Sequence, residues 1–341
     1  MDILNLLCAQ FDLGTPTEVL AGTKGVTNSK FRITTTQGQF FVKAVRNVSD
    51  ARLRYVHDVE QYMISQGIPA VSSLSLKKTG EKGKVEGEVL WMVADGVAYI
   101  PYPFIESIQN LTLGEKDYEK MGEMLAKIHM AGERAPRSLL INFVAEIPHA
   151  DKVRSLKEMR DTIAGRADLN ENDRKILAYL NYKLSITPKI KEGSTYVRDA
   201  LIHGDFHQDN ILFVHQKETI IVAVCDWERT WYGSKATELA NSIIFSCFRK
   251  NTPYSDALTF AKALLNGYRE VQTISIPEIL DGFDANISSV VLDTILEKEY
   301  YRSGSQLALE AIPHQKHILE LLLKSKIQDD LLGNSRPFSN L

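Results

Sequence analysis

The stretch His203-Gly204-Asp205-Phe206-His207-Gln208-Asp209-Asn210 is the most informative part of this chain, because the segment directly after it has the pattern of two short strands. Two apolar runs, residues 211–214 and 220–225, flank the polar segment 215–219. Apolar runs of this length around a polar turn predict a β-hairpin. The second run ends directly before another acidic residue, Asp226.

The hairpin brings distant polar residues to one place. In an antiparallel pair, the start of the first strand lies beside the end of the second, so we expect Asn210 and Asp226 at the same edge. Asp205 is then one loop turn away. Three oxygen-bearing side chains of this kind can hold Mg²⁺ and orient a hydroxyl, which indicates phosphoryl transfer. The alternative is a loop whose Asp and Asn residues only cap local turns.

Composition and charge narrow the class of protein. The chain has 341 residues and a formal net charge of −3, which suits about two domains and gives no reason to expect a nucleic-acid partner. Three widely spaced cysteines indicate neither a disulfide framework nor a zinc site, and they fit a reduced, cytoplasmic setting. No signal peptide and no apolar run of about 18 residues is seen, so we expect no membrane association. The sequence does not predict the oligomeric state.

The first third of the chain reads as a β-rich lobe. A short helix is expected over residues 2–11, and one long helix over 50–66, where Ser49 or Asp50 caps it and Gly67 stops it. The polar run 77–87 is expected to be a solvated loop. Strands are predicted over residues 18–21, 30–36, 39–45, 71–77, 88–93 and 97–105.

The remainder of the chain, apart from the hairpin, has helical apolar spacing. Helices are predicted over residues 114–130, 152–163, 171–184, 235–248, 254–268, 277–298 and 314–332. The sequence therefore predicts an α+β fold with two lobes, an antiparallel N-terminal lobe at 1–106 and a mainly helical C-terminal lobe at 107–332. The hinge is expected at about 101–107, and 333–341 forms a tail.

A lysine in the third predicted strand is the next candidate. Alternation places Phe41, Lys43 and Val45 on one face, and a lysine that shares a face with two apolar side chains needs a partner or a phosphate. Glu60 lies in the long helix after this strand, and we expect it to pair with Lys43. A Lys–Glu pair between such a strand and helix positions nucleotide phosphates in protein kinases.

Two further segments are candidates for nucleotide binding. The run Gly22-Thr23-Lys24-Gly25-Val26-Thr27-Asn28 joins two strands, and its small residues let backbone N–H groups approach phosphates. A glycine-containing turn is the alternative explanation. In Pro101-Tyr102-Pro103-Phe104-Ile105-Glu106, the backbone at the hinge is expected to bind an adenine edge, with Phe104 beside it. A plain linker stiffened by proline is the alternative there.

These residues together resemble the aminoglycoside phosphotransferase and choline kinase superfamily, which has a protein-kinase-like fold. The resemblance covers about residues 18–248 and is strongest at H-G-D-F-H-Q-D-N and at Cys225-Asp226-Trp227-Glu228. It implies that Asp205 is the catalytic base and that Asn210 and Asp226 bind Mg²⁺. It also implies that Lys43 contacts the phosphates of ATP and pairs with Glu60.

The same resemblance extends to two other segments. Gly25, Thr27 and Asn28 lie in what looks like the phosphate-covering loop of that family, and residues 122–129 look like its helix after the hinge. His129 in that helix is interpreted as a packing residue. Choline and ethanolamine kinases usually carry H-N-D where this chain has His203-Gly204-Asp205, so the subgroup stays open.

The predicted activity is transfer of the γ-phosphoryl group of ATP, with GTP not excluded, to a hydroxyl of a small molecule. An aminoglycoside, an amino alcohol such as choline or ethanolamine, and homoserine are the candidate acceptors. Acid and aromatic groups suit an amine, and the residues expected near the acceptor are His207, Glu228 and Trp231. The alternative is that the aromatic rings in this region fill the core.

Two other classes of protein fit the sequence less well. A protein kinase is disfavoured because A-P-E and H-R-D are missing. A non-catalytic binding or regulatory protein with a kinase-like fold is disfavoured because Lys43, Asp205, Asn210 and Asp226 are all present.

Overall fold

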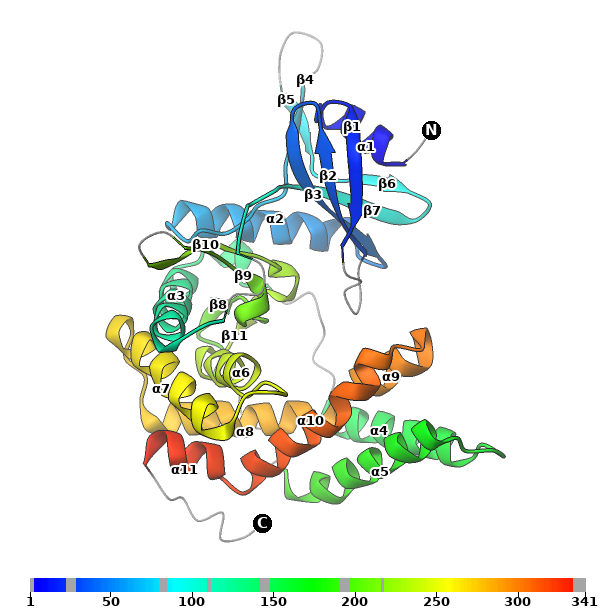
Figure 1. The fold of residues 1–341 in the computed structure, drawn as a ribbon, viewed down its shortest axis with the longest axis vertical. Coiled ribbons are helices and arrows are strands. Elements are labelled where there is room, and N and C mark those ends of the chain that lie inside the picture. The colour runs from blue at the N-terminus through cyan, green and yellow to red at the C-terminus, as the bar shows by residue number, and fades with distance from the viewer. Residues whose placement is uncertain are drawn as a thin grey trace. The chain divides into compact units, whose positions relative to one another are not determined.

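The computed structural model describes residues 3–22, 29–79, 85–108, 112–141, 148–190, 197–215 and 218–333. The chain forms two compact units, whose elements are labelled in Figure 1. Unit 1 comprises Met1–Leu111 and Asp209–Thr230, and unit 2 comprises Thr112–Gln208 and Trp231–Leu341. The hairpin after Asn210 is therefore part of the same unit as the N-terminal strands.

Unit 1 is built on a five-stranded sheet with the strand order β1-β2-β3-β7-β6, in which every neighbouring pair is antiparallel. The strands are β1 (Pro16–Ala21), β2 (Ser29–Thr35), β3 (Gly38–Arg46), β6 (Met92–Ala94) and β7 (Val97–Pro103). The turn between β2 and β3 pairs Thr35 with Gly38, so its two central residues are Thr36 and Gln37, one position earlier than the ends of the predicted strands imply. This turn fixes the register of every pair behind it.

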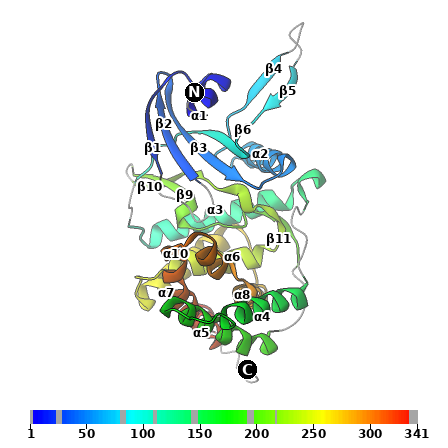
Figure 2. The same cartoon turned by 90° about the vertical axis from the view of Figure 1, so that its right-hand side faces the viewer.

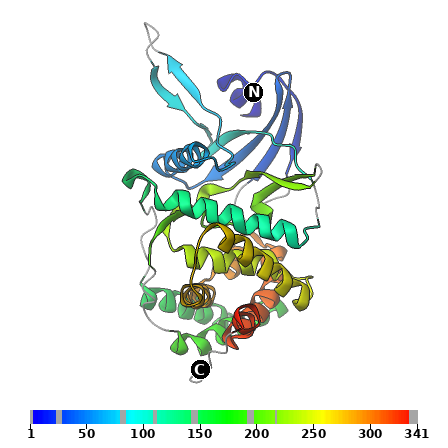
Figure 3. The same ribbon diagram turned by 90° about the vertical axis from the view of Figure 1, so that its left-hand side faces the viewer.

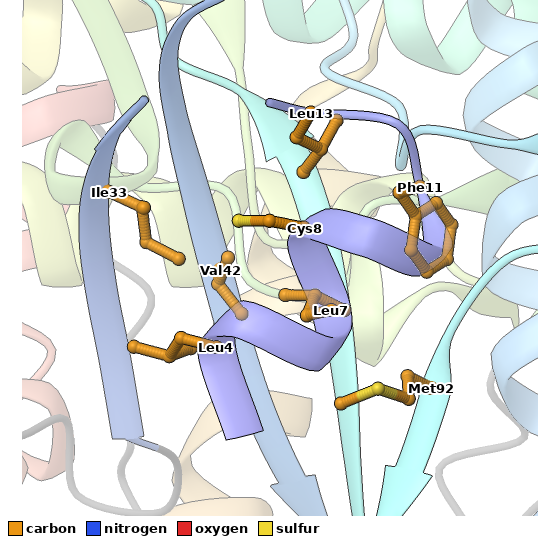
Figure 4. Packing of buried hydrophobic residues seen from close by; sticks show 8 residues of the cluster. All are labelled: Leu4, Leu7, Cys8, Phe11, Leu13, Ile33, Val42 and Met92. Carbon is orange, nitrogen blue, oxygen red and sulfur yellow. The ribbon is translucent and has the colours of Figure 1, made fainter. Parts of the chain in front are cut away.

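The two faces of this sheet are covered by different helices. Helix α1 (Ile3–Gln10) packs Leu4, Leu7 and Cys8 against Ile33 and Val42 of the sheet, as Figure 4 shows. Val45, which lies three residues after Val42 in β3, belongs instead to a cluster with Leu53 of α2 (Asp50–Ser65). The alternation predicted for β3 is confirmed, because successive side chains of a strand point to opposite faces.

The predicted hairpin is also confirmed. Strands β9 (Ile211–His215) and β10 (Thr219–Val224) pair antiparallel, with Ile211 opposite Val224. The backbone N–H of Val71 donates to Val224 O at 3.1 Å, and that of Ile108 donates to Phe213 O at 2.9 Å. These bonds attach the hairpin to other segments of unit 1.

One loop prediction was wrong. Residues expected to form a solvated loop at 77–87 contribute to a two-stranded ladder of β4 (Leu76–Thr79) and β5 (Val85–Val89), which extends away from the five-stranded sheet in Figures 2 and 3. A run of polar residues indicates that the side chains are exposed, but it does not exclude hydrogen bonds between the main chains of two strands. The strand expected from residue 71 begins only at Leu76, because Val71 and Leu74 donate singly to Val224 O and Pro101 O.

Unit 2 is mainly helical, as predicted. Its α-helices are α3 (Glu115–Glu133), α4 (His149–Ala164), α5 (Glu171–Ile186), α6 (Lys235–Cys247), α7 (Tyr254–Val271), α8 (Ile276–Leu292), α9 (Ile295–Ser303), α10 (Gln306–Leu323) and α11 (Lys326–Leu332). A short ladder of β8 (Ala200–Ile202) and β11 (Trp231–Gly233) was not predicted, since three residues show no period. Within the described residues, no helix is both long enough and apolar enough to cross a membrane.

Glycines allow α3 to approach its neighbours closely. A Cβ atom on Gly122 would overlap the carbonyl oxygen of Leu264 in α7, and one on Gly132 would overlap that of Leu201 in β8. Figure 3 shows α3 as one continuous helix. The strand β8 is thereby held against α3 directly before His203.

Two long helical predictions were each interrupted. The run 277–298 divides into α8 and α9 because the Asp293 carboxylate accepts from Ile295 N–H at 2.9 Å and the Asp293 carbonyl accepts from the Lys183 ammonium at 2.6 Å. The run 314–332 divides at Ser325, which has a φ of 53°. Neither tertiary contact nor a left-handed serine leaves a signal in apolar spacing.

Candidate functional site

Strand β8 leads directly into His203-Gly204-Asp205 in unit 2. His203 is fully buried, and Gly204 has a φ of 83°, a conformation that favours glycine. The N–H of Asp205 donates to His203 Nδ1 at 3.2 Å. The side chain of Asp205 is 30% exposed, and the His207 imidazole lies 3.7 Å from it. The loop therefore buries its histidine and presents its carboxylate to solvent.

A buried carboxylate from α6 holds this loop by its backbone. Glu238 accepts hydrogen bonds from the N–H groups of His203, at 3.1 Å, and of Gly204. It also accepts from His129 Nε2 at 2.9 Å, and His129 Nδ1 lies 2.8 Å from the Tyr268 hydroxyl. Helices α3, α6 and α7 thus fix the main chain directly before Asp205.

Sequence reasoning missed the role of Glu238, which lies 35 residues beyond His203. The interpretation of His129 as a packing residue agrees with its place in this network, where it is fully buried. A charged residue on the buried face of α6, among apolar neighbours, is the signal that would have indicated Glu238.

In unit 1, the base of the hairpin places two predicted metal ligands close along the backbone. The N–H of Cys225 donates to the carbonyl oxygen of Asn210 at 2.8 Å, and Asp226 is the next residue. Asp226 has φ 69° and ψ 51°, the left-handed region that residues other than glycine rarely adopt. The predicted convergence of positions 210 and 226 at one hairpin edge is confirmed.

Lys43 joins this edge from β3. Its ammonium lies 3.2 Å from Asp226 Oδ1 and 2.5 Å from Glu228 Oε1, and the residue is only 5% exposed. Burial alone lowers the pKa of Lys43, but the carboxylates of Glu228 and Asp226 outweigh it and the net pKa is raised. Lys43 is therefore charged and held by two acidic residues far along the chain.

The pKa values of Asp226 and Glu228 are shifted in opposite directions. Burial favours the neutral form of both, yet hydrogen bonding from Glu228 and the charges of Lys43 and Lys30 hold the pKa of Asp226 well below its usual range. Burial raises the pKa of Glu228 to about 7, although Lys43 opposes the rise. Two carboxylates in one buried place separate in pKa because both cannot ionise freely.

A model of the phosphotransferase enzyme family, APH, matches residues 18–274. This chain belongs to that family. The predicted resemblance is confirmed, and the match includes both the stretch 203–210 and the segment after the hairpin.

The sequence is also similar to those of homoserine kinases. A homoserine kinase from Burkholderia mallei is 24% identical over 214 residues, which are 62% of this chain and 58% of the relative. The match thus spans about three fifths of that relative's length.

Solved structures show the fold. The spectinomycin phosphotransferase APH(9)-Ia, in complex with ADP and spectinomycin, has a TM-score of 0.62 at 15% identity and covers 94% of this chain and 98% of its own. The amicoumacin kinase hAmiN, in complex with AMP-PNP, Ca²⁺ and Ami, has a TM-score of 0.60 at 14% identity, with 94% of each chain covered. The predicted α+β, protein-kinase-like fold is confirmed.

The expected Lys43–Glu60 ion pair is not formed among the described residues. Glu60 is 2% exposed, and its carboxylate accepts from the N–H of Ser73 at 3.1 Å. Burial raises the pKa of Glu60 to about 8, while Ser73 and Lys43 oppose the rise. Lys43 acts on Glu60 only through space, because Glu228 and Asp226 occupy its ammonium group.

A second lysine at this edge was missed. Lys30 on β2 is the cross-strand partner of Lys43, and its ammonium lies 3.5 Å from Asp226 Oδ2. Like charges opposite one another on a sheet are unfavourable unless an anion lies between them. The turn lies at Thr36 and Gln37, whereas the predicted strands 30–36 and 39–45 would place Lys43 opposite Arg32, so the sequence reading did not indicate this pair.

The other candidate residues have mixed surroundings. The Phe104 ring lies under the Arg32 guanidinium, 4.6 Å from it, and Ile105 packs against the cluster that contains Val45 and Leu53. Trp231 is half-buried on β11, opposite Ile202. Gly25, Thr27 and Asn28 lie outside the described residues.

The donor set at this edge suits a hard divalent cation. Asn210 and Asp226 supply an amide oxygen and a carboxylate, which Mg²⁺ prefers and usually combines with phosphate oxygens. One oxygen of Glu228, Oε2, is buried with no hydrogen-bond partner. Among the described residues, no group of three or more His, Cys, Asp or Glu side chains forms a metal cluster.

Proposed function

We propose that this chain transfers the γ-phosphoryl group of ATP to a hydroxyl of a small molecule, with Mg²⁺ as the metal. The observation that carries the proposal is the buried Lys43 held beside Asp226, with Lys30 on the other oxygen of the same carboxylate. Two cations and an acid directed at one place suit a polyphosphate with its metal. Membership of the phosphotransferase enzyme family supports this proposal.

The nucleotide is proposed to bind unit 1. Lys43 and Lys30 would contact its phosphates, and Gly25, Thr27 and Asn28 would cover them from the loop after β1. Glu60 supports this region by fixing the Ser73 backbone. Backbone groups near Phe104 and Ile105 would receive the base, so ATP and GTP are to be compared directly. The two solved relatives contain ADP and AMP-PNP.

Asn210 and Asp226 are the proposed metal ligands. A bound Mg²⁺ offsets negative charge on phosphate oxygens. The backbone hydrogen bond from Cys225 N–H to Asn210 O holds residues 210 and 226 at the same hairpin edge, which supports this assignment. Glu228, which the sequence places near the acceptor, is proposed instead as the partner of Lys43, since the two groups are 2.5 Å apart.

Asp205 is the proposed catalytic base. It would accept a hydrogen bond from the acceptor hydroxyl and take its proton as the new P–O bond forms. Glu238 holds the two backbone N–H groups before it, so the loop is fixed while the carboxylate stays accessible. His207 is proposed to orient this carboxylate and to lie near the acceptor, together with Trp231.

The acceptor is proposed to be a small amino acid or amino alcohol with a free hydroxyl, homoserine being the first to test. The homoserine kinase relative favours it over an aminoglycoside. We propose a cytoplasmic location, with neither a nucleic acid nor a membrane as a partner. We also propose the lobe boundaries expected from the sequence, which are 1–106 and 107–332, with the hinge at about 101–107 and the tail at 333–341.

An acceptor screen tests this proposal. Purified protein is incubated with Mg·ATP or Mg·GTP and with homoserine, choline, ethanolamine or an aminoglycoside, and the phosphorylated product is detected by mass spectrometry. Product is expected with one acceptor class and lost when the metal is chelated. The proposal fails if no acceptor is phosphorylated and if Mg·ATP also leaves the melting temperature unchanged, because a ligand of the native state raises stability.

A further inference from the structure

Arg52 makes an unusual long-range contact. It is the third residue of α2, and one nitrogen of its guanidinium donates to the carbonyl oxygens of Glu228, at 2.7 Å, and of Thr230, at 2.9 Å. These partners lie 176 and 178 residues further along the chain. All three residues belong to unit 1.

The contact falls where a short turn ends. Residues Trp227–Arg229 form one turn of 3₁₀-helix, closed by a bond from Thr230 N–H to Trp227 O at 3.0 Å. Carbonyl groups at the end of a helical turn lack partners within it, and a cation is favourable there. Arg52 supplies both a donor and a positive charge at this end of the turn.

The surroundings of Arg52 strengthen the contact. The residue is half-buried, and its guanidinium lies over the ring of the buried Tyr55 at 5.1 Å from the centroid. Restricted access of water makes hydrogen bonds from a charged donor stronger than at an exposed surface. A guanidinium on a fixed ring also loses little side-chain entropy on binding.

The other end of the turn is under conformational strain. Asp226 precedes the turn in the left-handed region, which is strained for most residues other than glycine. The indole N–H of Trp227 donates to Val224 O at 3.0 Å and holds that end. Arg52 holds the opposite end, so the strained residue lies between two fixed points.

We propose that Arg52 is a positioning residue that fixes the turn 226–230 to α2 and thereby presents the Asp226 carboxylate to the metal. The inference rests on the proposed function and deepens it. Arg52 acts through backbone carbonyls and contacts neither phosphate nor acceptor. Loss of its contact releases the turn, and the carboxylates of Asp226 and Glu228 then sample several positions relative to Lys43.

Three variants separate this role from general stabilisation. Arg52→Gln removes the charge and shortens the donor. Arg52→Lys keeps the charge, but its chain is one bond shorter, so it reaches one carbonyl at most. Arg54→Gln is the matched control, because it makes the same charge change on the same helix, where the Arg54 guanidinium lies over the Trp91 ring.

Two measurements are made on the full chain. The first is amide hydrogen exchange at residues 227–230 without nucleotide or metal. The second is the affinity for AMP-PNP by calorimetry, with Mg²⁺ and with the metal chelated. We expect Arg52→Gln to speed exchange at Thr230 by about tenfold or more and to weaken the gain in affinity from Mg²⁺ by about tenfold, the usual size for a charged hydrogen bond. Arg52→Lys should be intermediate, and Arg54→Gln should match the wild type.

Two results would overturn the inference about Arg52. Wild-type exchange at 227–230 in Arg52→Gln overturns the inference, as does an equal loss of affinity with and without Mg²⁺, which marks a purely structural role. If the wild type gains no affinity from Mg²⁺, the proposed function fails instead. The exchange measurement, which needs no ligand, then decides alone whether Arg52 holds the turn.

Discussion

The Lys43 ammonium lies 2.5 Å from the carboxylate of Glu228, whereas Glu60, the acid expected to pair with it, is engaged by the backbone of Ser73. The pairing acid in this chain therefore comes from the turn after the hairpin and not from α2. This arrangement links Lys43, the lysine proposed to contact phosphate, directly to the segment that carries Asp226. A nucleotide with its metal would enter a place where these charges are already balanced.

Replacing Lys43 tests that balance. Lys43→Met leaves the half-buried carboxylates of Asp226 and Glu228 without the ammonium group that they share, so we expect loss of Mg·ATP binding and a fall in turnover of about 100-fold or more. Calorimetry with Mg·AMP-PNP and a steady-state assay check it. Lys30→Met is the comparison: its ammonium is more exposed, so a several-fold rise in KM for ATP with little change in kcat is expected. Equal effects of the two changes would contradict the leading role of Lys43.

Glu238 offers a test of the loop before Asp205. In Glu238→Gln, the amide NH₂ faces at least one of the N–H groups of His203, Gly204 or His129, which leaves buried donors unpaired. We expect a loss of about 1–3 kcal/mol in unfolding free energy and a fall in kcat, with little change in nucleotide affinity. Urea unfolding and steady-state kinetics check this expectation. Glu119→Gln, in an exposed acid of α3, should change neither quantity.

The buried acid Glu60 predicts a pH dependence of stability. Burial raises its pKa to about 8, above the ordinary value of 4.5, so between these values the folded chain holds a proton that the unfolded chain has lost. Its contribution is complete below about pH 4.5 and is lost as the pH rises through about 8, by at most about 1.4 kcal/mol per pH unit. Urea unfolding of the metal-free protein at a series of pH values measures it.

The Glu60→Gln variant isolates this contribution. Because the amide introduced by this substitution does not ionise, the fall in unfolding free energy between about pH 5 and about pH 8 should be smaller in the variant by the share of this one group. Glu123→Gln, in an exposed acid of α3, should keep the wild-type slope. Identical slopes in the wild type and in Glu60→Gln would show that Glu60 ionises normally in the folded chain.

The close contact of α3 with α7 predicts a strong effect of a single methyl group. In Gly122→Ala, the added Cβ would overlap the Leu264 carbonyl and lie 2.7 Å from the Tyr268 nitrogen, so backbone must move. We expect a loss of about 1–3 kcal/mol or more in unfolding free energy, measured by urea unfolding. Gly165→Ala is the control, since its Cβ would lie 3.3 Å from the nearest atom, Asp161 O, and should cost little.

The features that the sequence could predict were local. The hairpin 211–224, the alternation of β3 and most helices are indicated by apolar spacing, because period and turn residues reflect local geometry. The Lys30–Lys43 register was not indicated, because the turn lies at Thr36 and Gln37, one residue before the gap between the predicted strands. The contacts of Lys43 with Glu228, of Arg52 with the turn, and of Glu238 with His203 join residues that are far apart. The contacts of Arg52 and Glu238 depend on how α2 and α6 are rotated about their axes, and that of Lys43 depends on where the turn 227–229 lies, none of which is specified by apolar spacing.

The same limit explains the errors at helix ends. The break between α8 and α9 depends on Lys183, which donates to the carbonyl of Asp293, 110 residues away. The left-handed Asp226, which aims the turn at Lys43, has no signal in residue type beyond the tolerance of aspartate for that region. The residues of the proposed chemistry could be identified from residue type and spacing. Their hydrogen-bond and ion-pair partners could be identified only from the three-dimensional structure.

Asp205 is proposed to be the catalytic base, and single-turnover formation of the phosphorylated acceptor measures the effect of removing it. Asp205→Asn should slow product formation by about 10²–10⁴-fold, because the proton acceptor is lost. Its affinity for Mg·AMP-PNP should stay within about twofold of the wild type, since the proposed nucleotide ligands lie in unit 1. Product formation at the wild-type rate in Asp205→Asn would contradict the account.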